Sequence, residues 1–362
     1  MSKKRVLMAM SGGVDSSLAA ALLLEQGFDL IGITVRGWSP PNWQGEYTDK
    51  ACCSLAAVED ARAVAYSLGI PFYTLNMADA FWQYIVQPFI TSYSQGLTPN
   101  PCILCNKHIR FDLLYRKALE LECDAVATGH FARIKDDNGQ FSLYRGVDAL
   151  KDQSYMLYTI SQKELAMTIY PLGEMTKPEV RSEAAKRNLR TAQRSESQDI
   201  CFVPDGNYAK LVKEFCPEAA TPGPIIYRNG RKIGEHRGLC YHTVGQRKGL
   251  GIAWTEPLYV CELDVQQNAL IVAEHNYLLQ DQLIARDINW INETSQAQLP
   301  LEVEVKIRYG SKQVPAELFV LAESDNACIV KLKQAQFAVS PGQAIVFYKG
   351  DQVLGGGTIS NS

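Results

Sequence analysis

Short apolar runs alternate with helical patterns along the first half of the chain. The predicted strands are 5–10, 30–35, 72–75 and 125–128, and the predicted helices are 16–26, 55–68 and 107–121. Strands that alternate with helices form βαβ units, whose strands pair in parallel. The pattern therefore predicts a doubly wound parallel sheet, of the α/β class.

A further helix is expected at the end of this region. Thr176 and Glu179 have the spacing of a capping box, so a helix should begin there and include 180–188. Beyond Asp205, prolines and glycines cluster and the apolar runs become short, which indicates a domain boundary.

Short β-like runs separated by turn residues dominate the second half. Asn229 and Gly230 join two such runs, and Asn-Gly favours a hairpin with a type I′ turn, in which both central residues have positive φ. Alternating residues in 301–307, 327–332 and 344–347 predict antiparallel strands of a second small barrel or sandwich. We predict an α/β domain over 1–205, a small β domain over 206–280 and a β-barrel over 281–362.

Composition places the chain among ordinary globular proteins. Of its 362 residues 46% are hydrophobic and 21% are charged, and the formal charge is −3. A nucleic acid would therefore have to bind a local basic patch. The longest apolar runs are too short for a signal peptide or a membrane span. Ten cysteines are too few for a disulfide scaffold, so we expect a cytoplasmic protein with no membrane partner.

A glycine loop joins the first predicted strand to the first helix. Residues 11–17 read Ser-Gly-Gly-Val-Asp-Ser-Ser, and a helix N-terminus after such a turn presents backbone N–H groups to an anion. The loop lacks the lysine of GxxxxGK[ST], and it is not GxGxxG. Phosphate is the natural ligand, and the alternative is a tight turn with an Asp or Ser helix cap.

This loop resembles that of the PP-loop ATP pyrophosphatases. Members of that family bind ATP there, transfer AMP to an oxygen and release pyrophosphate. The resemblance implies ATP and Mg²⁺ as cofactors. Asp15 is then expected to position magnesium or orient the reacting groups, with helix capping as the alternative.

Cysteines provide the second chemical signal. Cys102 and Cys105 precede the helix predicted from residue 107, where the helix dipole favours a thiolate, so Cys105 is a candidate nucleophile. Three nearby residues add positive charge, namely Lys107, His108 and Arg110. Cys201 reaches Cys105 only through folding. The alternatives are half a zinc site for the CxxC and a small buried residue for Cys201, although no second CxxC has zinc-finger spacing.

Both signals together resemble the tRNA-specific 2-thiouridylases, over nearly the whole chain. The matching segments are 10–17, 98–107, 127–130, 151–155, 197–202, 241–251 and 341–348. The resemblance implies that Cys105 is the catalytic cysteine and that Cys201 carries a persulfide. It places the ATP site at Ala9, Met10, Ser11, Gly12, Gly13, Val14, Asp15, Ser16, Val35 and Gly129. It places tRNA contacts at His130, Lys151, Asp152, Gln153, Arg308, Tyr309 and Gln343.

Cys102 departs from the family pattern, because many members have Asp there. Soft thiolates favour Fe–S clusters or zinc, and three cysteines around a [4Fe–4S] cluster would leave one iron open to carry sulfur. Two routes therefore stay open. Either a persulfide on Cys201 attacks and Cys105 resolves it, or Cys102, Cys105 and Cys201 hold a cluster.

The implied activity is that of an ATP-dependent tRNA sulfurtransferase. AMP is transferred to O2 of the wobble uridine, U34, and sulfur then displaces it to give 2-thiouridine. The implied partners are tRNAs of the Lys, Glu and Gln type and a persulfide donor such as a cysteine desulfurase or relay protein. The rival hypotheses are an amidating synthetase with the same loop and a noncatalytic metal-binding RNA module.

A basic and aromatic stretch is the candidate RNA surface. Its members are Tyr227, Arg228, Arg231, Lys232, His236, Arg237, Tyr241, Arg247 and Lys248. Such interleaving suits phosphates and bases, whereas the alternative is a solvated hairpin face. The helix with Lys177, Arg181, Lys186 and Arg187 is expected to extend this patch. Loops around 95–105 and 195–203 are expected to become ordered when tRNA binds.

Overall fold

The structure is a computed structural model, which describes residues 3–40, 55–194, 200–203, 206–292, 298–321 and 326–360. Residues 197–199 of the second cysteine motif and the boundary residue Asp205 lie outside this part of the chain. Two compact units are present. The first comprises Met1–Val86, Cys102–Gly206 and Asp351–Val353, and the second comprises Gln87–Pro101, Asn207–Gly350 and Leu354–Ser362. No helix among the described residues is long and apolar enough to cross a membrane.

A five-stranded sheet is the centre of the first unit. Its order is β3 (Phe72–Asn76), β2 (Asp29–Arg36), β1 (Arg5–Ala9), β4 (Ala125–Ala127) and β7 (Thr168–Ile169). Every neighbouring pair runs parallel. The predicted α/β class with a parallel sheet is therefore confirmed.

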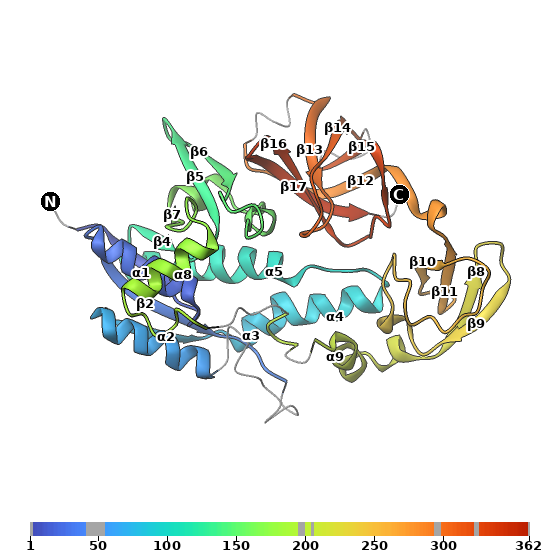
Figure 1. Cartoon of the computed structure of the whole chain (residues 1–362), viewed down its shortest axis with the longest axis horizontal. Helices are drawn as coiled ribbons and strands as arrows, with labels where there is room; N and C mark the ends of the chain where they lie inside the picture. Colours follow the sequence, from blue (N-terminus) through green and yellow to red (C-terminus); the bar gives the residue numbers. More distant parts are fainter. Residues whose placement is uncertain are drawn as a thin grey trace. The chain divides into compact units, whose positions relative to one another are not determined.

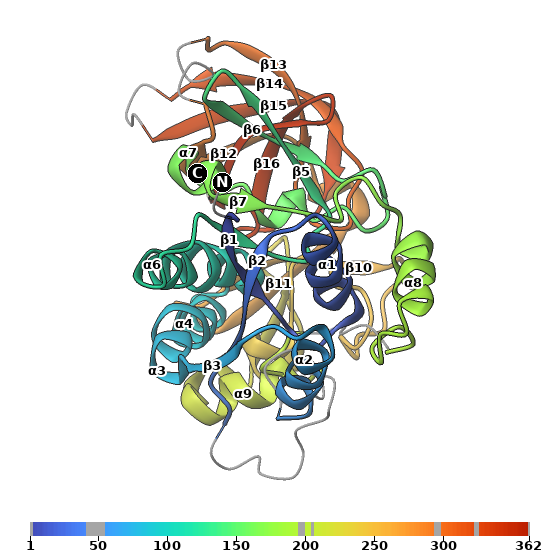
Figure 2. The same ribbon diagram turned by 90° about the vertical axis from the view of Figure 1, so that its left-hand side faces the viewer.

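Alternating side chains of β1 pack into two separate hydrophobic cores on the two faces of the sheet. Val6 and Met8 are fully buried on the face covered by α1 (Val14–Glu25), α2 (Leu55–Leu68) and α8 (Lys177–Lys186). Leu7 is buried on the opposite face, against α6 (Leu114–Glu120). Figure 2 shows α1 and α8 on one side of β1 and α6 on the other. A strand buried on both faces explains why β1 is apolar from Val6 to Ala9.

The helix predictions are confirmed in position and wrong in one detail. Thr176 caps α8, and its backbone N–H and hydroxyl both bond Glu179 Oε2 at 2.7 Å, as the capping box predicted. The predicted helix 107–121 is instead α5 (Pro101–Leu104), a π-helix η2 (Cys105–Leu113) and then α6. Sequence periodicity did not reveal the π-helical register.

Several elements of the first unit had no prediction. They are α3 (Ala78–Phe81), η1 (Trp82–Val86), η3 (Ser154–Met156), α7 (Gln162–Ala166), and the hairpin of β5 (Ala132–Asp137) and β6 (Gln140–Arg145). Leu143 and Tyr144 of β6 pair with Val353 and Gln352, which belong to the same unit. The charged run Lys135–Asp137 concealed β5, because its outer half is exposed.

The second unit contains a small mixed sheet. Its order is β10 (Leu258–Asp264), β11 (Ala269–Glu274), β8 (Gly223–Tyr227) and β9 (Lys232–His236). Helices α4 (Gln87–Ser94) and α9 (Tyr208–Phe215), with 3-10 turns η4 (Pro217–Ala220), η5 (Leu239–Tyr241) and η6 (His275–Leu278), complete this part.

The predicted hairpin at Asn229 is confirmed, but its predicted turn type is wrong. Gly230 has a φ of 90°, whereas Asn229 is not among the residues with positive φ. The backbone N–H of Tyr227 donates to Arg231 O at 2.8 Å and that of Gly230 to Tyr227 O at 2.8 Å. These bonds close a three-residue loop with glycine in the left-handed position, instead of a two-residue type I′ turn.

Six strands close into a barrel, seen in orange and red in Figure 1. They are β12 (Leu279–Trp290), β13 (Leu301–Lys306), β14 (Val314–Val320), β15 (Ala327–Phe337), β16 (Ala344–Lys349) and β17 (Gln352–Ser360). The ring follows the order β12, β15, β14, β13, β16, β17, and antiparallel pairing of β12 with β17 closes it. Inward-facing apolar residues such as Val305, Val330 and Phe347 are fully buried. The barrel prediction is confirmed, and a sandwich is excluded.

Candidate active site

The carboxyl ends of β1 and β4 form the switch point of the parallel sheet. From β1 the chain continues to β2 on one side, whereas β4 lies on the other side, so the loops after these two strands diverge and leave a crevice. A cavity of about 180 Å³ opens there. Its lining is Ala9, Met10, Ser11, Asp15, Ser16, Ile33, Thr34, Val35, Phe81, Cys105, Ile109, Arg110, Leu114, Gly129, His130 and Gln153.

The glycine loop after β1 begins α1 without a side-chain cap. Gly13 is the N-cap residue, with extended φ and ψ of −89° and 166°, and no side chain bonds the helix start as a cap. The Ser17 hydroxyl donates to Gly13 O at 2.8 Å, and the backbone N–H of Ser11 donates to Ser16 Oγ at 3.1 Å. The alternative of an Asp or Ser helix cap is therefore wrong.

Two glycines allow backbone segments to touch at this crevice. Gly12 has a φ of 72°, and a Cβ there would lie 2.2 Å from Ala57 O. A Cβ on Gly129 would lie 2.7 Å from Ser16 N and 2.8 Å from the carbonyl carbon of Asp15. The loop after β4 thus packs directly on the first turn of α1, which only glycine permits.

Asp15 forms an ion pair that the sequence did not suggest. Lys177 Nζ donates to the two carboxylate oxygens of Asp15 at 2.7 and 2.8 Å, and Lys177 is only 7% exposed. The prediction that Lys177 extends an RNA-binding patch is wrong, because its ammonium is directed into the first unit. Lys177 occupies the first turn of α8, where its backbone N–H also donates to Asp148 Oδ2 at 2.9 Å.

His130 is a buried neutral histidine in the cavity wall. Its Nε2 lies 3.3 Å from Arg110 Nη1, and its Nδ1 lies 2.7 Å from Thr128 Oγ1. A guanidinium only donates, so Nε2 accepts and Nδ1 carries the proton. Burial, and then the charge of Arg110, lower the pKa of His130 well below its usual range. The imidazole is therefore uncharged near neutral pH.

The cysteines of the sequence motifs lie differently. Cys105 begins η2, is half-buried and lines the cavity, whereas Cys102 is exposed and does not line it. Cys201 is half-buried, and the next residue, Phe202, packs edge-on against Phe81 with ring centroids 5.8 Å apart. Because Phe81 lines the cavity, the segment with Cys201 borders the cavity wall.

Metal ligands are not gathered in the described part of the chain. No group of three or more His, Cys, Asp and Glu side chains lies close enough there to hold a metal ion. The three cysteines do not fit a cluster in this arrangement. Asp15 lines the cavity with both of its oxygens bonded to Lys177, so a magnesium ion at Asp15 would share the carboxylate with that ammonium.

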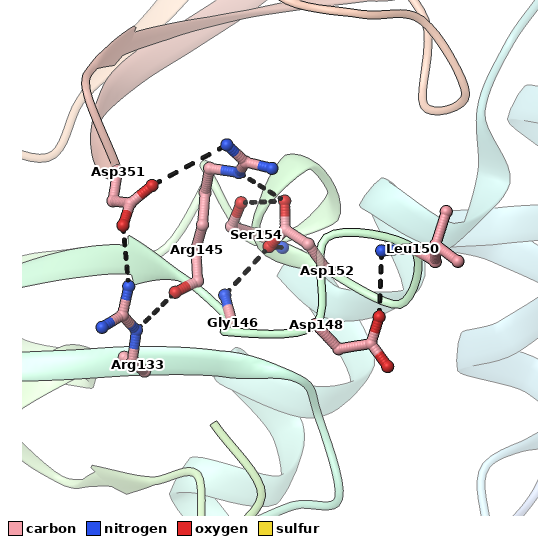
Figure 3. Close-up of polar contacts among 8 residues, drawn as sticks. All are labelled: Arg133, Arg145, Gly146, Asp148, Leu150, Asp152, Ser154 and Asp351. Carbon is pink, nitrogen blue, oxygen red and sulfur yellow. Dashed lines mark hydrogen bonds and ion pairs between the residues drawn. The ribbon is translucent and has the colours of Figure 1, made fainter. Parts of the chain in front are cut away.

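The loop with three of the predicted tRNA contacts is tightly bonded (Figure 3). Asp152 is 3% exposed, and its carboxylate accepts from the backbone N–H groups of Gly146 and Ser154 and from the Ser154 hydroxyl, at 3.1–3.2 Å. Arg145 Nε lies 3.3 Å from the same carboxylate. Asp152 thus holds the loop together.

The flanking residues of that loop are more accessible. Lys151 is half-buried, and Gln153 lines the cavity while its Oε1 accepts from the backbone N–H of Phe131 at 3.0 Å. Asp351 joins the loop base, with Oδ2 3.1 Å from Arg133 Nη2 and Oδ1 3.7 Å from Arg145 Nη1 (Figure 3). Lys151 and Gln153 are therefore better placed than Asp152 for an RNA.

The remaining predicted tRNA contacts belong to the second unit. Arg308 Nη2 donates to the carbonyls of Phe337 and Ala338, which fixes its guanidinium. Tyr309 is 37% exposed, and Gln343 is half-buried and uses its backbone in turn hydrogen bonds. The structure thus distributes the predicted site over both units.

The basic stretch of the small sheet is partly structural. His236 is 4% exposed, with Nε2 3.0 Å from Asn268 O and Nδ1 accepting from the backbone N–H of Gly238. Arg228 Nε lies 3.0 Å from Glu274, and the guanidinium of Arg237 covers the ring of Tyr241 at 4.3 Å. His236 is therefore not part of an exposed surface.

The sequence did not identify Arg110, Thr128 or Lys177 as residues of the site. Arg110 was weighed only for its charge, Thr128 only as the end of a strand, and Lys177 only as part of a basic helix. A capping box that places a lysine in the first helical turn was the one available signal for Lys177. Arg110 had no signal, because its place depends on the π-helical register.

A glycine loop at the switch point of a parallel sheet, with a cysteine in the same cavity, defines an α/β nucleotide-binding protein of the PP-loop class. Three family models match the chain. They are a tRNA methyl transferase HUP domain over residues 4–205, a tRNA methyl transferase PRC-barrel domain over 209–274 and an aminomethyltransferase β-barrel domain over 280–359.

Curated relatives resemble the chain over nearly its full length. The tRNA-specific 2-thiouridylase MnmA of Symbiobacterium thermophilum is 47% identical, covering 99% of this chain and 93% of that protein. The protein of the same name from Heliobacterium modesticaldum is 48% identical, covering 99% and 92%. The chain belongs to the tRNA-specific 2-thiouridylase family.

Solved structures match more distantly. The U34-tRNA thiolase NcsA from Methanococcus maripaludis with its [4Fe-4S] cluster is 22% identical, with a TM-score of 0.34, covering 59% of this chain and 67% of that one. A 4-thiouridine synthetase in complex with RNA and bound ATP is 16% identical, with a TM-score of 0.37, covering 59% and 51%.

Proposed function

We propose that the protein is an ATP-dependent tRNA sulfurtransferase that converts the wobble uridine, U34, to 2-thiouridine. The observation that carries the proposal is the shared cavity of the glycine loop and Cys105 at the switch point of the sheet. Family membership supports it, because the relatives are named tRNA-specific 2-thiouridylases. The same proposal includes the cytoplasmic location expected from the sequence.

The first part of the cavity is the ATP site. Backbone N–H groups of the first turn of α1 and its positive dipole end suit phosphates. Most of the predicted nucleotide residues line the cavity, which supports their assignment. They are Ala9, Met10, Ser11, Asp15, Ser16, Val35 and Gly129. Gly12, Gly13 and Val14 belong to the same loop and complete the proposed set.

Activation of the base precedes sulfur transfer. The O2 oxygen of uridine attacks the α-phosphorus of ATP, and pyrophosphate leaves, so that a poor leaving oxygen becomes part of a good leaving group, AMP. The neutral imidazole of His130 lies in the same cavity, where Arg110 and Thr128 hold its two nitrogens and its uncharged ring can contact the base. A cavity that holds ATP and the base together lowers the entropic part of the activation barrier, because the two reactants no longer have to meet from solution.

Sulfur then replaces the adenylated oxygen. The terminal sulfur of a persulfide on Cys201 attacks C2, and the C2–O bond breaks as AMP departs. The Cys105 thiolate attacks Sγ of Cys201, the persulfide S–S bond breaks, and the transferred sulfur stays on C2. The resulting disulfide between the two cysteines needs a thiol reductant before the next turnover, and a persulfide donor reloads Cys201.

Cofactors and partners extend the proposal. Magnesium accompanies ATP, and we derive no step through it because Asp15 is bound to Lys177. The cluster route with Cys102, Cys105 and Cys201 is not favoured by the ligand arrangement of the described residues. The substrates are tRNAs of the Lys, Glu and Gln type, and the donor is a cysteine desulfurase or relay protein. The proposed tRNA contacts are His130, Lys151, Gln153, Arg308, Tyr309 and Gln343. Asp152 holds the loop that carries Lys151 and Gln153.

The test is mass analysis of nucleosides from tRNA incubated with ATP, reductant and a persulfide donor. The expected product has one sulfur in place of oxygen, which mass distinguishes from an added methyl group. Cys105→Ser and Cys201→Ser abolish the product and keep tRNA binding, whereas Cys261→Ser, a half-buried cysteine of the second unit, keeps the activity.

Other outcomes would select a rival hypothesis. Amide formation with ammonia would indicate an amidating synthetase, and RNA binding without tRNA-dependent pyrophosphate release would indicate a noncatalytic module. Iron and sulfide in anaerobically purified enzyme, with activity that requires them, would establish the cluster route.

A further inference from the structure

The π-helix η2 sets which side chains enter the cavity. Its backbone hydrogen bonds follow an i to i+5 pattern, so residues four and five apart share one side of the helix. In an α-helix, residues five apart are about 140° apart around the axis. The cavity-lining residues here are Cys105, Ile109 and Arg110 of η2 and Leu114, the first residue of α6. They lie four, five and nine positions after Cys105, which fits the π-helical register.

Arg110 is thereby placed beside Cys105 and the glycine loop. Arg110 Nη1 donates to His130 Nε2 at 3.3 Å, and this bond orients the guanidinium along the cavity wall. Among the described residues that line the cavity, Arg110 is the one with a lysine or arginine side chain. The other two basic residues of the segment do not line the cavity. Lys107 is exposed, and His108 stacks on Tyr84 at 4.8 Å.

The carboxylate and the guanidinium of the cavity lining belong to Asp15 and Arg110. Asp15 is paired with Lys177, so its negative charge is compensated from outside the lining set. His130 is neutral. An anion that enters the cavity therefore meets Arg110 on the Cys105 side and helix N–H groups on the loop side.

We propose that Arg110 binds the α-phosphoryl group of the nucleotide. This inference rests on the proposed function, in which the α-phosphorus bonds to O2 of the base while the cysteine sulfur approaches C2. The phosphoryl group must then lie between the glycine loop and Cys105, where Arg110 is placed. Arginine suits that position because its planar fork pairs with two phosphate oxygens.

Comparison of two ligands tests the role of Arg110. Equilibrium dialysis measures the Kd of AMP and of adenosine, which differ only in the α-phosphoryl group. The wild-type enzyme prefers AMP, and Arg110→Met weakens AMP about tenfold while the Kd of adenosine is unchanged, as expected for one charged hydrogen-bonding partner. Arg110→Lys restores part of the AMP preference, because it keeps the charge and loses the fork.

Arg116→Met is the matched control. Arg116 lies on α6, its side chain is 68% exposed, and it pairs with Asp112 at 2.7 Å, so both Kd values stay at the wild-type level. Equal weakening of AMP and adenosine by Arg110→Met would overturn the inference, since it would indicate a structural role. Unchanged AMP binding in that variant, or a wild type that binds ATP without preferring AMP to adenosine, would overturn it too. A wild type that binds no adenine nucleotide would contradict the proposed function itself, and the inference with it.

Discussion

The switch-point cavity and the closed barrel bury different kinds of atoms. At the cavity, charged and polar side chains lie below the surface, including Lys177, His130 and Asp152, and each has named partners. The barrel core is a continuous apolar cluster around Val305, Val330 and Phe347. Buried polar groups cost free energy unless they are hydrogen-bonded. Their concentration near one edge of the sheet therefore indicates that ligand binding, and not stability alone, accounts for the residues found there.

The difference separates stability from ligand binding. A residue of the barrel core should affect only the free energy of unfolding, whereas a residue of the cavity wall should affect ligand affinity as well. Substitutions of the same chemical type in the two regions therefore test whether stability and ligand binding separate in this way.

Two phenylalanines give the largest expected effect. Phe347 is fully buried in the barrel, and Phe81 is 2% exposed in the cavity wall. Each Phe→Ala change should lower the free energy of unfolding of its unit by about 3–5 kcal/mol, because it removes buried ring contacts and leaves a cavity. Thermal unfolding and ATP titration below the transition measure both properties. Phe81→Ala should weaken ATP binding and Phe347→Ala should not, and equal losses of affinity would abolish the distinction.

The ion pair under the glycine loop comes next. Lys177→Met leaves Asp15 without its ammonium partner, and because the Asp15 side chain is 32% exposed, the expected destabilisation is about 1–3 kcal/mol, less than for a fully buried pair. The uncompensated carboxylate also repels phosphates, so ATP affinity should fall about tenfold.

Lys186→Met on the same helix is the control for Lys177. Lys186 is 67% exposed and pairs with Glu183, so its loss should change stability by less than about 0.5 kcal/mol. The double variant Asp15→Asn with Lys177→Met should recover part of the lost affinity. A double variant no better than Lys177→Met would show that the lysine acts through something other than Asp15.

At neutral pH the smallest effect is expected from a buried histidine of the second unit, because its contribution to stability changes only as the pH falls. Burial, and then the charges of His236 and Arg237, lower the pKa of His242 to about 4. Its two ring nitrogens are buried, and the neighbouring Gln246 side chain offsets only a small part of the lowering. The unfolded chain, with a histidine pKa of about 6.5, binds a proton between these two values when the folded protein does not. Stability is therefore complete above about pH 6.5 and decreases as the pH falls towards 4, by at most about 1.4 kcal/mol per pH unit.

Substitution of His242 isolates this contribution. His242→Phe should flatten the dependence of unfolding free energy on pH between 6.5 and 4, in denaturant titrations at several pH values. His275→Gln, at an exposed histidine, should leave the wild-type dependence. An unchanged slope in His242→Phe would assign the acid sensitivity to other groups.

The sequence predicted the elements that repeat a simple pattern. Strands with apolar runs, such as Val6–Met8 in β1, and the capping box at Thr176 depend on local chemistry, and both are confirmed. The glycine loop was also local, because turn, helix start and anion binding lie within seven residues. The three proposed domains and the site assignments stay predictions.

The errors came from register and from distant contacts. One π-helical segment decided that Arg110 faces the cavity, and no apolar periodicity distinguishes i+4 from i+5 over nine residues. Lys177 and Asp15 are 162 positions apart, so their pairing depends on how α8 packs beside α1. The turn at Gly230 also differed, because one additional loop residue changes the required backbone angles.

Closure of the barrel restricts how another molecule can attach to it. Each of the six strands has a neighbour on both sides in the described part of the chain, with β12 bonded to both β15 and β17. In the described part of the chain, β6 is the strand added from outside the ring, at Gln352 and Val353 of β17, and the pairing around the ring leaves little other backbone edge for a visiting polypeptide. Whatever contacts this domain must be recognised by protruding side chains and connecting loops, which can diverge among relatives while the ring beneath them is retained.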